Sequence, residues 1–329
     1  MSQTMTETHA TAVRGAFRYG EPDSAIPADK RSLFSQPHLV NLQEETLPLR
    51  DYRSDTKLVR GVEGLHKHGF TLVEHHLDPH AWDDEAAVRG AYIPSVEQLV
   101  KNVTGCKTAI VNNVAFRRKH ATQYDADKNF YHPRDGDLDK MLATLPCDRA
   151  MISPIDPAKS LEPARSVHVD YTMKGLLDTV RYCREDMSLA GTEALKAIDA
   201  GKRPPRVAAY SVWRPLKPVI RDPIAILNWT SPGDITKDLR AFDYRAKGYK
   251  GDYLLEAYTI AKPKNLENHE WYYVSEQKPH EVLMFKFADT ESQYDPEVAV
   301  ACGHASPMVI GTEKEDPRES IEARVLAFW

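Results

Sequence analysis

The stretch Val167-His168-Val169-Asp170-Tyr171 opens the β-rich half of the sequence and predicts a short strand. Residues i and i+2 of a strand point to the same side of a sheet, so His168 and Asp170 can present an imidazole and a carboxylate to one metal ion. Tyr171 is expected to point to the opposite face. The stretch therefore predicts two ligands of a metal site on one face of a strand.

Short apolar runs follow this stretch from Arg206 onward. They are bounded by Pro and Gly and are rich in Val, Ile, Tyr and Trp, a pattern typical of strands in an antiparallel sandwich or barrel. We expect strands at 207–213, 224–229, 271–274, 282–288, 298–302, 308–310 and 321–329. The β-rich core is therefore expected over about 160–329.

Mixed helix and strand signals precede this core. Ser95 and Gln98 form a capping-box pattern, and Gly105 stands where such a helix would end. Apolar periodicity predicts another helical segment over 172–200. Short β-branched runs predict two further strands, at 69–73 and 107–116. The fold class is therefore mainly β with flanking α-helices.

The domain organisation follows from where periodicity begins. Residues 1–48 mix charge, Pro and Ser without a sustained pattern, so we expect an irregular N-terminal arm there. Residues 49–329 are expected to form a single domain, because they contain no repeat and no low-complexity tract.

Composition limits the partners and the compartment. The formal charge of −5 and the short basic cluster Arg117-Arg118-Lys119 do not form the positive stripe that nucleic acid requires. The four cysteines are scattered, and no apolar run is long enough to span a membrane. We expect a cytoplasmic protein with a small-molecule substrate and without nucleic-acid or membrane partners; a homodimer stays open.

A second His-x-Asp tripeptide, His76-Leu77-Asp78, shows that the spacing alone is weak. It lies in a polar segment together with His75 and His80, which indicates a loop leading to a helix. Surface histidines are the simpler interpretation of that cluster, whereas His168 stands before the β-rich half. We therefore prefer His168 and Asp170 as ligands.

A third ligand must come from another strand, and the histidines after Asp170 are His269, His280 and His304. Two histidines and one carboxylate form the facial triad of non-haem iron(II) oxygenases. His269 is interpreted as solvated and His280 as a turn residue. His304 is preferred because a basic residue at the start of a C-terminal strand, Arg318, follows it at a suitable distance.

Arg318 can grip the distal carboxylate of 2-oxoglutarate through two parallel hydrogen bonds. Ser320, two residues along the same strand face, adds a hydroxyl donor. Arg324 shares this face further along. Arg324 has two interpretations: contact with 2-oxoglutarate, or a structural ion pair with Glu322 or another carboxylate.

These residues give the chain a resemblance to a known family. It resembles the iron(II)/2-oxoglutarate oxygenases of the hydroxylase/desaturase group in natural-product pathways, which includes gibberellin desaturases and the cephem methoxylase component. The resemblance runs from about His68 to the C-terminus. It rests on Tyr92-Ile-Pro-Ser-Val-Glu-Gln-Leu-Val-Lys, the stretch 167–172, Ser211-Val212-Trp213-Arg214-Pro215, Glu281-Val-Leu-Met-Phe-Lys and Pro317-Arg318-Glu319-Ser320-Ile-Glu-Ala-Arg324.

The resemblance implies a double-stranded β-helix (jelly-roll, cupin-like) core with an N-terminal helical extension. It implies Fe(II), 2-oxoglutarate and O2 as cofactor and co-substrates, with succinate and CO2 as co-products. The reaction would act on a C–H bond of a small secondary metabolite, by hydroxylation, desaturation or oxidative ring formation. Trp213, Arg214 and Tyr171 are candidate pocket residues, although Ser211 stands where the family pattern has Asn.

Two other functions remain open at this point. One is a cupin-type metalloenzyme that does not use 2-oxoglutarate, against which Arg318 and Ser320 argue. The other is a non-catalytic β-sandwich binding module in which His168 and Asp170 only bond to each other.

Overall fold

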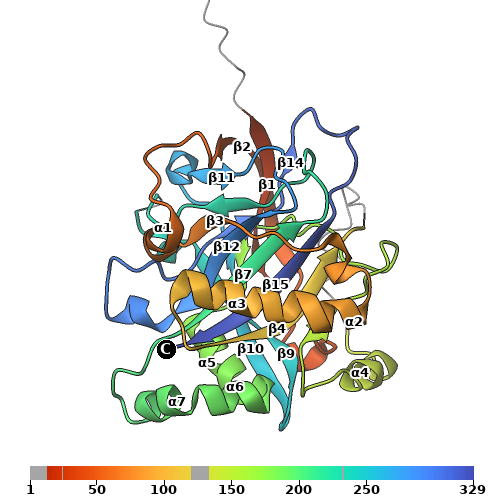
Figure 1. Cartoon of the computed structure of the whole chain (residues 1–329), viewed down its shortest axis with the longest axis vertical. Coiled ribbons are helices and arrows are strands. Elements are labelled where there is room, and N and C mark those ends of the chain that lie inside the picture. The colour runs from red at the N-terminus through yellow and green to blue at the C-terminus, as the bar shows by residue number, and fades with distance from the viewer. Residues whose placement is uncertain (1–12, 24, 120–132, 232) are drawn as a thin grey trace, which may run out of the picture.

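Two β-sheets that face each other form the framework of the protein (Figure 1). The computed structural model describes residues 13–23, 25–119, 133–231 and 233–329. The nine-stranded sheet has the order β14-β1-β2-β11-β8-β13-β6-β10-β9, and the six-stranded sheet has the order β3-β12-β7-β15-β4-β5. Most neighbouring strands are antiparallel, as a jelly roll requires.

The strands are β1 (Arg14–Pro22), β2 (Leu39–Asp51), β3 (Phe70–Glu74), β4 (Thr108–Arg117), β5 (Met151–Ile152), β6 (His168–Val169), β7 (Val207–Pro215), β8 (Ala225–Leu227), β9 (Leu239–Gly248), β10 (Gly251–Ile260), β11 (Trp271–Tyr273), β12 (Glu281–Asp289), β13 (His304–Ala305), β14 (Met308–Val309) and β15 (Ser320–Phe328). The α-helices are α1 (Gly61–Lys67), α2 (Glu85–Ala87), α3 (Ile93–Thr104), α4 (Gly136–Ala143), α5 (Met173–Asp178), α6 (Glu185–Ala190) and α7 (Thr192–Asp199).

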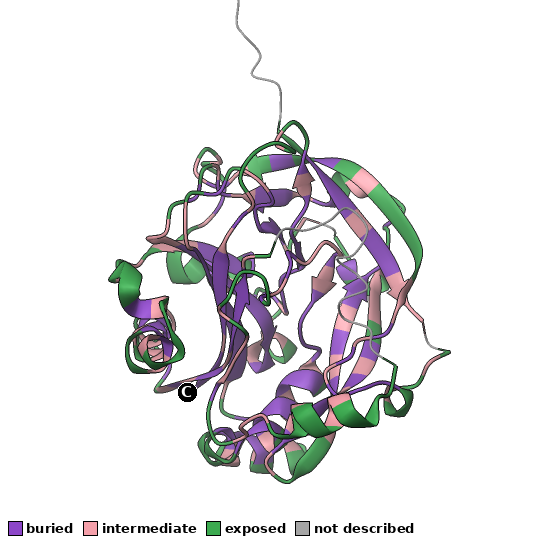
Figure 2. Cartoon of the chain, turned by 90° about the vertical axis from the view of Figure 1, so that its right-hand side faces the viewer, coloured by how far each residue is buried: buried purple, intermediate pink, exposed green. Residues whose placement is uncertain are grey.

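The main core lies between the two sheets, where buried residues gather in Figure 2. The six-stranded sheet contributes Trp213, Phe285 and Phe287, and the nine-stranded sheet contributes Ile226 and Tyr272. Successive residues of a strand alternate between two faces, so each strand of the six-stranded sheet also has an outer face to cover. This arrangement puts the residues on the inner faces of both sheets within reach of one another.

Helix α3 covers the outer face of the six-stranded sheet (Figure 1). Val96 and Val100 of the helix belong to the same buried cluster as Val212 of β7 and Val325 of β15. The helix ends at Gly105, whose φ of +73° is the left-handed conformation that glycine adopts at little cost. The sheet is therefore buried on both faces, which explains its near-continuous apolar strands.

The predicted strands and helices are mostly confirmed, with three differences. Ser95 does not cap a helix, because α3 continues from the π-helical turn Val88–Tyr92 and the Ser95 hydroxyl bonds to His75 instead. The helical segment predicted over 172–200 is divided into three helices with a π-helical turn between the first two. The run 298–302 is a buried connection and not a strand.

The long hairpin β9–β10 was not predicted from the sequence, because neither strand contains a continuous apolar run. Its residues pair from Leu239 opposite Ile260 to Gly248 opposite Gly251. Buried residues alternate with more exposed ones along β9, so charged side chains interrupt every apolar run. Alternation of this kind is typical of a strand with one solvated face.

The irregular arm expected over 1–48 differs most from the structure, although residues 1–12 lie outside the described part. Strand β1 pairs with β2 and β14, and β2 continues into the sheet beside β11. Phe17 of β1 is fully buried and its ring lies 4.3 Å from that of Trp271. These strands are therefore part of the nine-stranded sheet.

No helix in the described ranges is long and apolar enough to cross a membrane.

We predict that Phe17→Ala lowers the free energy of unfolding by about 3–5 kcal/mol, because it opens a cavity beside Trp271. Urea denaturation followed by tryptophan fluorescence measures this change. Leu42→Ala is the matched control, since Leu42 lies on β2 with 48% of its surface exposed, and it should shift stability by less than ~0.5 kcal/mol. Equal, small effects of both substitutions would mean that β1 packs only loosely on the domain.

Candidate metal centre

Two neighbouring strands of the nine-stranded sheet, β6 and β13, position the predicted metal ligands. His168 lies on β6, Asp170 follows that strand directly, and His304 begins β13. The backbones of His304 and His168 are register partners in the β6–β13 pair. Paired residues in a ladder present their side chains on the same face, so the two imidazoles lie side by side.

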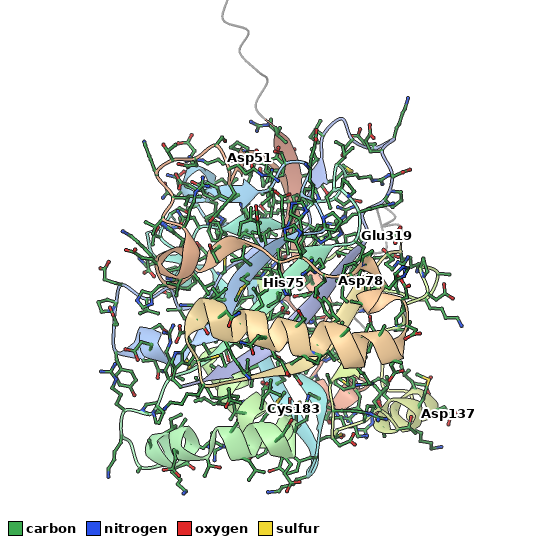
Figure 3. The ribbon with its side chains drawn as sticks, viewed as in Figure 1. Asp51, His75, Asp78, Asp137, Cys183 and Glu319 are labelled. Carbon is green, nitrogen blue, oxygen red and sulfur yellow. The ribbon has the colours of Figure 1, made fainter. Side chains whose placement is uncertain are left out.

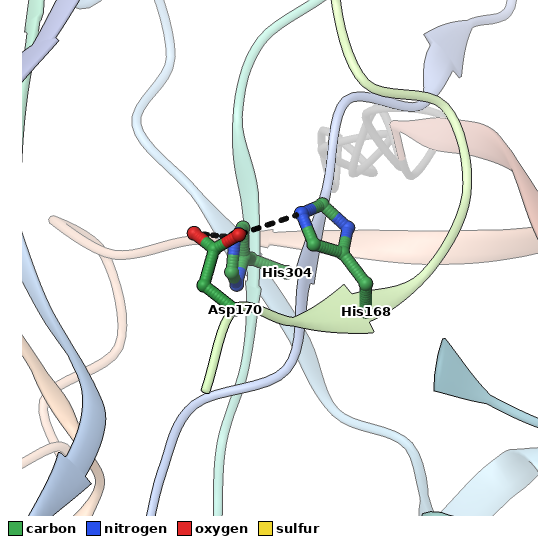
Figure 4. Close-up of side chains that lie close together, drawn as sticks. All are labelled: His168, Asp170 and His304. Atoms are coloured by element: carbon green, nitrogen blue, oxygen red, sulfur yellow. Dashed lines mark ion pairs between the residues drawn. The ribbon is translucent and has the colours of Figure 1, made fainter. Parts of the chain in front are cut away.

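The three side chains converge on one point between the sheets (Figure 4). Asp170 Oδ1 lies 3.9 Å from His168 Nε2, and Asp170 Oδ2 lies 3.6 Å from His304 Nε2. One ligand atom from each residue lies within 4.8 Å of the other two. In the part of the chain that the structure describes, this is the one such group of three or more.

A backbone carbonyl two residues earlier in the chain orients each of the two imidazoles. His168 Nδ1 donates to the carbonyl of Ser166 at 2.8 Å, and His304 Nδ1 donates to the carbonyl of Cys302 at 3.1 Å. A carbonyl can only accept, so each Nδ1 carries the proton and each Nε2 lone pair is free to bind a metal. The rotation of both rings is thus set before a metal arrives.

The surroundings keep the imidazole of His168 neutral and the carboxylate of Asp170 charged. Burial and the nearby His304 lower the pKa of His168 to about 3. Burial alone would raise the pKa of Asp170, but the Arg324 guanidinium, with Nη2 at 3.0 Å from Oδ1, and the imidazoles of His304 and His168 hold it well below its ordinary value. A metal ion would therefore meet ligands that are already deprotonated at neutral pH.

His168, Asp170 and His304 offer ligand atoms that fit a divalent iron ion. Asp170 Oδ2 is buried and has no hydrogen-bond partner among the described residues. Two imidazole nitrogens and one carboxylate on one side of an octahedral ion leave three positions open. That donor set suits Fe(II) with a chelating co-substrate better than it suits a closed structural zinc site.

A small cavity of about 20 Å³, lined by His168 and His304, joins this group to the six-stranded sheet. Arg318 lies at its wall beside Trp213, with the guanidinium carbon 5.4 Å from the centre of the indole ring. Arg318 Nε and Nη2 and the Ser320 hydroxyl are buried without hydrogen-bond partners in the described ranges. Burial, followed by the charge of Arg117, lowers the pKa of Arg318 to about 9. The cavity therefore presents hydrogen-bond donors that an anion would satisfy.

The other predicted pocket residues divide between the two faces of their strands. Trp213 faces the cavity, whereas Arg214 faces outward, where it bonds to the carbonyls of His75 and Pro279. Placing Arg214 in the pocket was wrong, because neighbouring residues of β7 alternate between the faces. Tyr171, also a candidate pocket residue, packs edge-on against Phe287 in the core and lines neither of the two cavities next to His168.

Arg324 does not line the cavity of Arg318. It donates to Asp170 and lines a second cavity on the other side of His168. The ion-pair alternative for Arg324 therefore agrees with the structure, and the partner is a predicted metal ligand rather than Glu322.

The competing histidines lie elsewhere. Figure 3 shows the segment with His75 and Asp78 above α3, on the outer side of the six-stranded sheet. His76 stacks on His280 at 4.8 Å, and His80 pairs with Asp83. His269 was expected to be solvated, and that was wrong: it is buried and bonds to the hydroxyl of Tyr19.

Arg117, Ser306 and Glu322 also line the Arg318 cavity, and the sequence interpretation missed them. Arg117 belongs to the basic cluster 117–119, which was considered only as too short for a nucleic-acid-binding stripe. The available signal was strand alternation: Arg117 pairs with Ser320 on β15, so the two side chains share the inner face.

Comparison with known proteins identifies the family. A family model described as an oxidoreductase/YMDC permease-like domain matches residues 22–328. The gibberellin cluster GA4 desaturase of Gibberella fujikuroi is 30% identical over 292 residues, which cover 80% of this chain and 82% of that protein. The chain belongs to the Fe(II)/2-oxoglutarate-dependent hydroxylase/desaturase family.

Two further comparisons agree with this assignment. The Fe(II)/2-oxoglutarate-dependent dioxygenase nvfI of Aspergillus novofumigatus is 28% identical over 84% of this chain and 81% of its own length. A solved structure of the iron and alpha-ketoglutarate-dependent endoperoxidase NvfI matches with a TM-score of 0.63, 22% identity and coverage of 96% and 97%. At that identity the structural match shows the fold alone, which is the jelly roll expected of this oxygenase family.

We predict that His168→Ala and Asp170→Ala each weaken Fe(II) binding more than about tenfold, because each removes a ligand of the group. Anaerobic Fe(II) titration by calorimetry measures the affinity. His76→Ala and Asp78→Ala are matched controls with the same tripeptide spacing, and both should bind iron like the unchanged protein. Loss of iron in the control variants instead would mean that His76 and Asp78, and not His168 and Asp170, bind the metal.

Proposed function

We propose that His168, Asp170 and His304 hold Fe(II), and that Arg318 and Ser320 bind the distal carboxylate of 2-oxoglutarate. The observation that carries this proposal is the buried, unpartnered guanidinium of Arg318 in one cavity with His168 and His304, with the unpartnered hydroxyl of Ser320 two residues further along the chain. A buried cation without a counter-ion is costly, and a bound carboxylate would remove that cost. Trp213 would support the guanidinium from its ring face.

When bound, Fe(II) with 2-oxoglutarate and O2 supplies the oxidising power for cleaving a C–H bond, with succinate and CO2 as co-products. The residues of the chain position and enclose these groups. The carbonyls of Ser166 and Cys302 fix the two imidazoles, and Arg324 holds Asp170 by one oxygen. The rings of Phe285 and Phe287 lie 4.7 and 5.7 Å from that of His304 and keep water from that side.

The substrate in this proposal is a small secondary metabolite. Its C–H bond would be hydroxylated, desaturated or used to close a ring. Support comes from similar proteins, which include a gibberellin cluster desaturase and a hydroxylase/desaturase from Hormonema carpetanum. The position of the substrate relative to the metal decides among these outcomes, since small displacements change which atom reacts.

We also propose a cytoplasmic location. Cys106, Cys147, Cys183 and Cys302 are all free, and three of them are buried, as expected in a reducing compartment. A homodimer, and the absence of nucleic-acid and membrane partners, stay predictions from composition.

We predict that the purified protein, loaded anaerobically with Fe(II), develops a charge-transfer absorption band on addition of 2-oxoglutarate. Admission of O2 should then yield succinate and CO2 in equal amounts, measured by mass spectrometry. A cupin-type enzyme that does not use 2-oxoglutarate would bind iron without producing succinate. A binding module would show neither stoichiometric iron nor the band, and either result would overturn the proposal.

We predict that Arg318→Lys raises the dissociation constant for 2-oxoglutarate by at least about tenfold, because an ammonium group cannot form two parallel hydrogen bonds with a carboxylate. Anaerobic titration of the charge-transfer band measures the constant. Arg181→Lys is a matched control, since Arg181 pairs with Asp199 on the surface. An unchanged constant in Arg318→Lys would assign the carboxylate to another cation.

A further inference from the structure

The metal group also faces a second cavity, of about 60 Å³, which Arg318 does not line. Asp170 and Arg324 line this cavity, whereas Arg318 and Trp213 line the first one. Only Arg117, Ala164 and His168 among the described residues touch both cavities. A molecule in the second cavity would therefore lie beside the metal without entering the space proposed for 2-oxoglutarate.

Arg117 is the cation at the junction of the two cavities. It ends β4 opposite Ser320, on the inner face of the sheet, and only 7% of its surface is exposed. Its Nη1 donates to the carbonyl of Glu162 at 2.6 Å. No carboxylate of the described residues forms an ion pair with it. Its charge is thus buried against a neutral acceptor.

Other charged groups around the second cavity are already paired. Arg165 lies 2.9 Å from Asp222, and Arg324 lies 3.0 Å from Asp170. Glu322 accepts a hydrogen bond from Ser211 and stands near three arginines: Arg117, Arg318 and Arg324.

The charges of the loaded site do not cancel. The three arginines near Glu322 face two carboxylates, Glu322 and Asp170. Bound Fe(II) would be offset by the two negative charges of 2-oxoglutarate. Among these three arginines and two carboxylates of the described residues, one positive charge therefore remains, and a further anion would neutralise it.

We propose that the substrate carries a carboxylate, and that Arg117 binds it in the second cavity; this inference rests on the proposed function. The carboxylate is assigned to the substrate and not to 2-oxoglutarate, because the unpartnered donors of Arg318 in the first cavity already serve the distal carboxylate of 2-oxoglutarate. Arg117 acts as a specificity-determining residue. A bidentate grip there would fix one end of the substrate and so set which C–H bond faces the metal.

The rest of the second cavity suits an apolar body. Pro37, Leu39 and Phe242 form part of its wall. Pro37 and Phe242 also line an open surface groove, which thus adjoins the cavity. The favoured substrate is therefore a compact apolar molecule with one acid group, admitted along the Pro37–Phe242 side.

The test compares matched acids and amides on the enzyme loaded anaerobically with Fe(II) and 2-oxoglutarate. The probes are benzoate and benzamide, cyclohexanecarboxylate and its amide, and 1-adamantanecarboxylate and its amide, with affinities measured by calorimetry. We expect at least one acid to bind tenfold or more tightly than its amide. In Arg117→Leu that preference should disappear, while the enzyme saturated with 2-oxoglutarate still shows the charge-transfer band. Arg117→Lys should keep part of the preference.

Controls separate the possible outcomes. Arg181→Leu removes the same charge at the surface and should behave like the unchanged enzyme. The inference is wrong if no acid exceeds its amide, if the preference survives in Arg117→Leu, or if that variant loses 2-oxoglutarate instead. Arg117→Gln replaces Arg117→Leu should the latter fail to fold. Failure of the proposed function is distinct, since the unchanged enzyme would then show no charge-transfer band with Fe(II) and 2-oxoglutarate.

Discussion

The backbone pairing of His168 with His304 is the constraint on which the rest of the site depends. The two strands involved have only two residues each, and each imidazole is tied to a carbonyl two residues earlier in the chain. Sequence-distant histidines are thereby held by local bonds once the strands meet. Rigid ligand positions are what a metal site needs, because loose ligands lose affinity and geometry together.

The two sheets contribute different residues to the site. The nine-stranded sheet carries the ligand group, and the six-stranded sheet carries Arg117, Arg318 and Ser320. The cavity between them thus depends on the aromatic packing of Trp213, Phe285 and Phe287, which holds the sheets apart at a fixed separation. A substitution in that core would move the anion-binding donors relative to the metal, although it touches neither.

Sequence reasoning predicted that His168 and Asp170 share one face, because period-two alternation brings residues i and i+2 to the same side of a strand, and the structure brings both side chains close to His304. The pairing with His304 rested on the position of Arg318 and not on any local pattern. Arg117 was missed, since a basic cluster at the end of a strand looks solvated until its pairing with Ser320 is known. Strands β1, β9 and β10 were not predicted, because charged residues interrupt their apolar residues. Their buried faces are evident only once the register of the sheet is known.

The connection between β1 and β2 contributes Gln36 and Pro37 to the wall of the second cavity, and Leu39, the first residue of β2, adjoins them. These residues precede the catalytic core in the chain by a long stretch and take no part in holding the metal. Mutational drift in this connection can therefore reshape the room offered to a substrate while the oxidising centre stays constant. Such separation gives one scaffold a simple route to new substrates during evolution, because selectivity and reactivity are inherited on different segments.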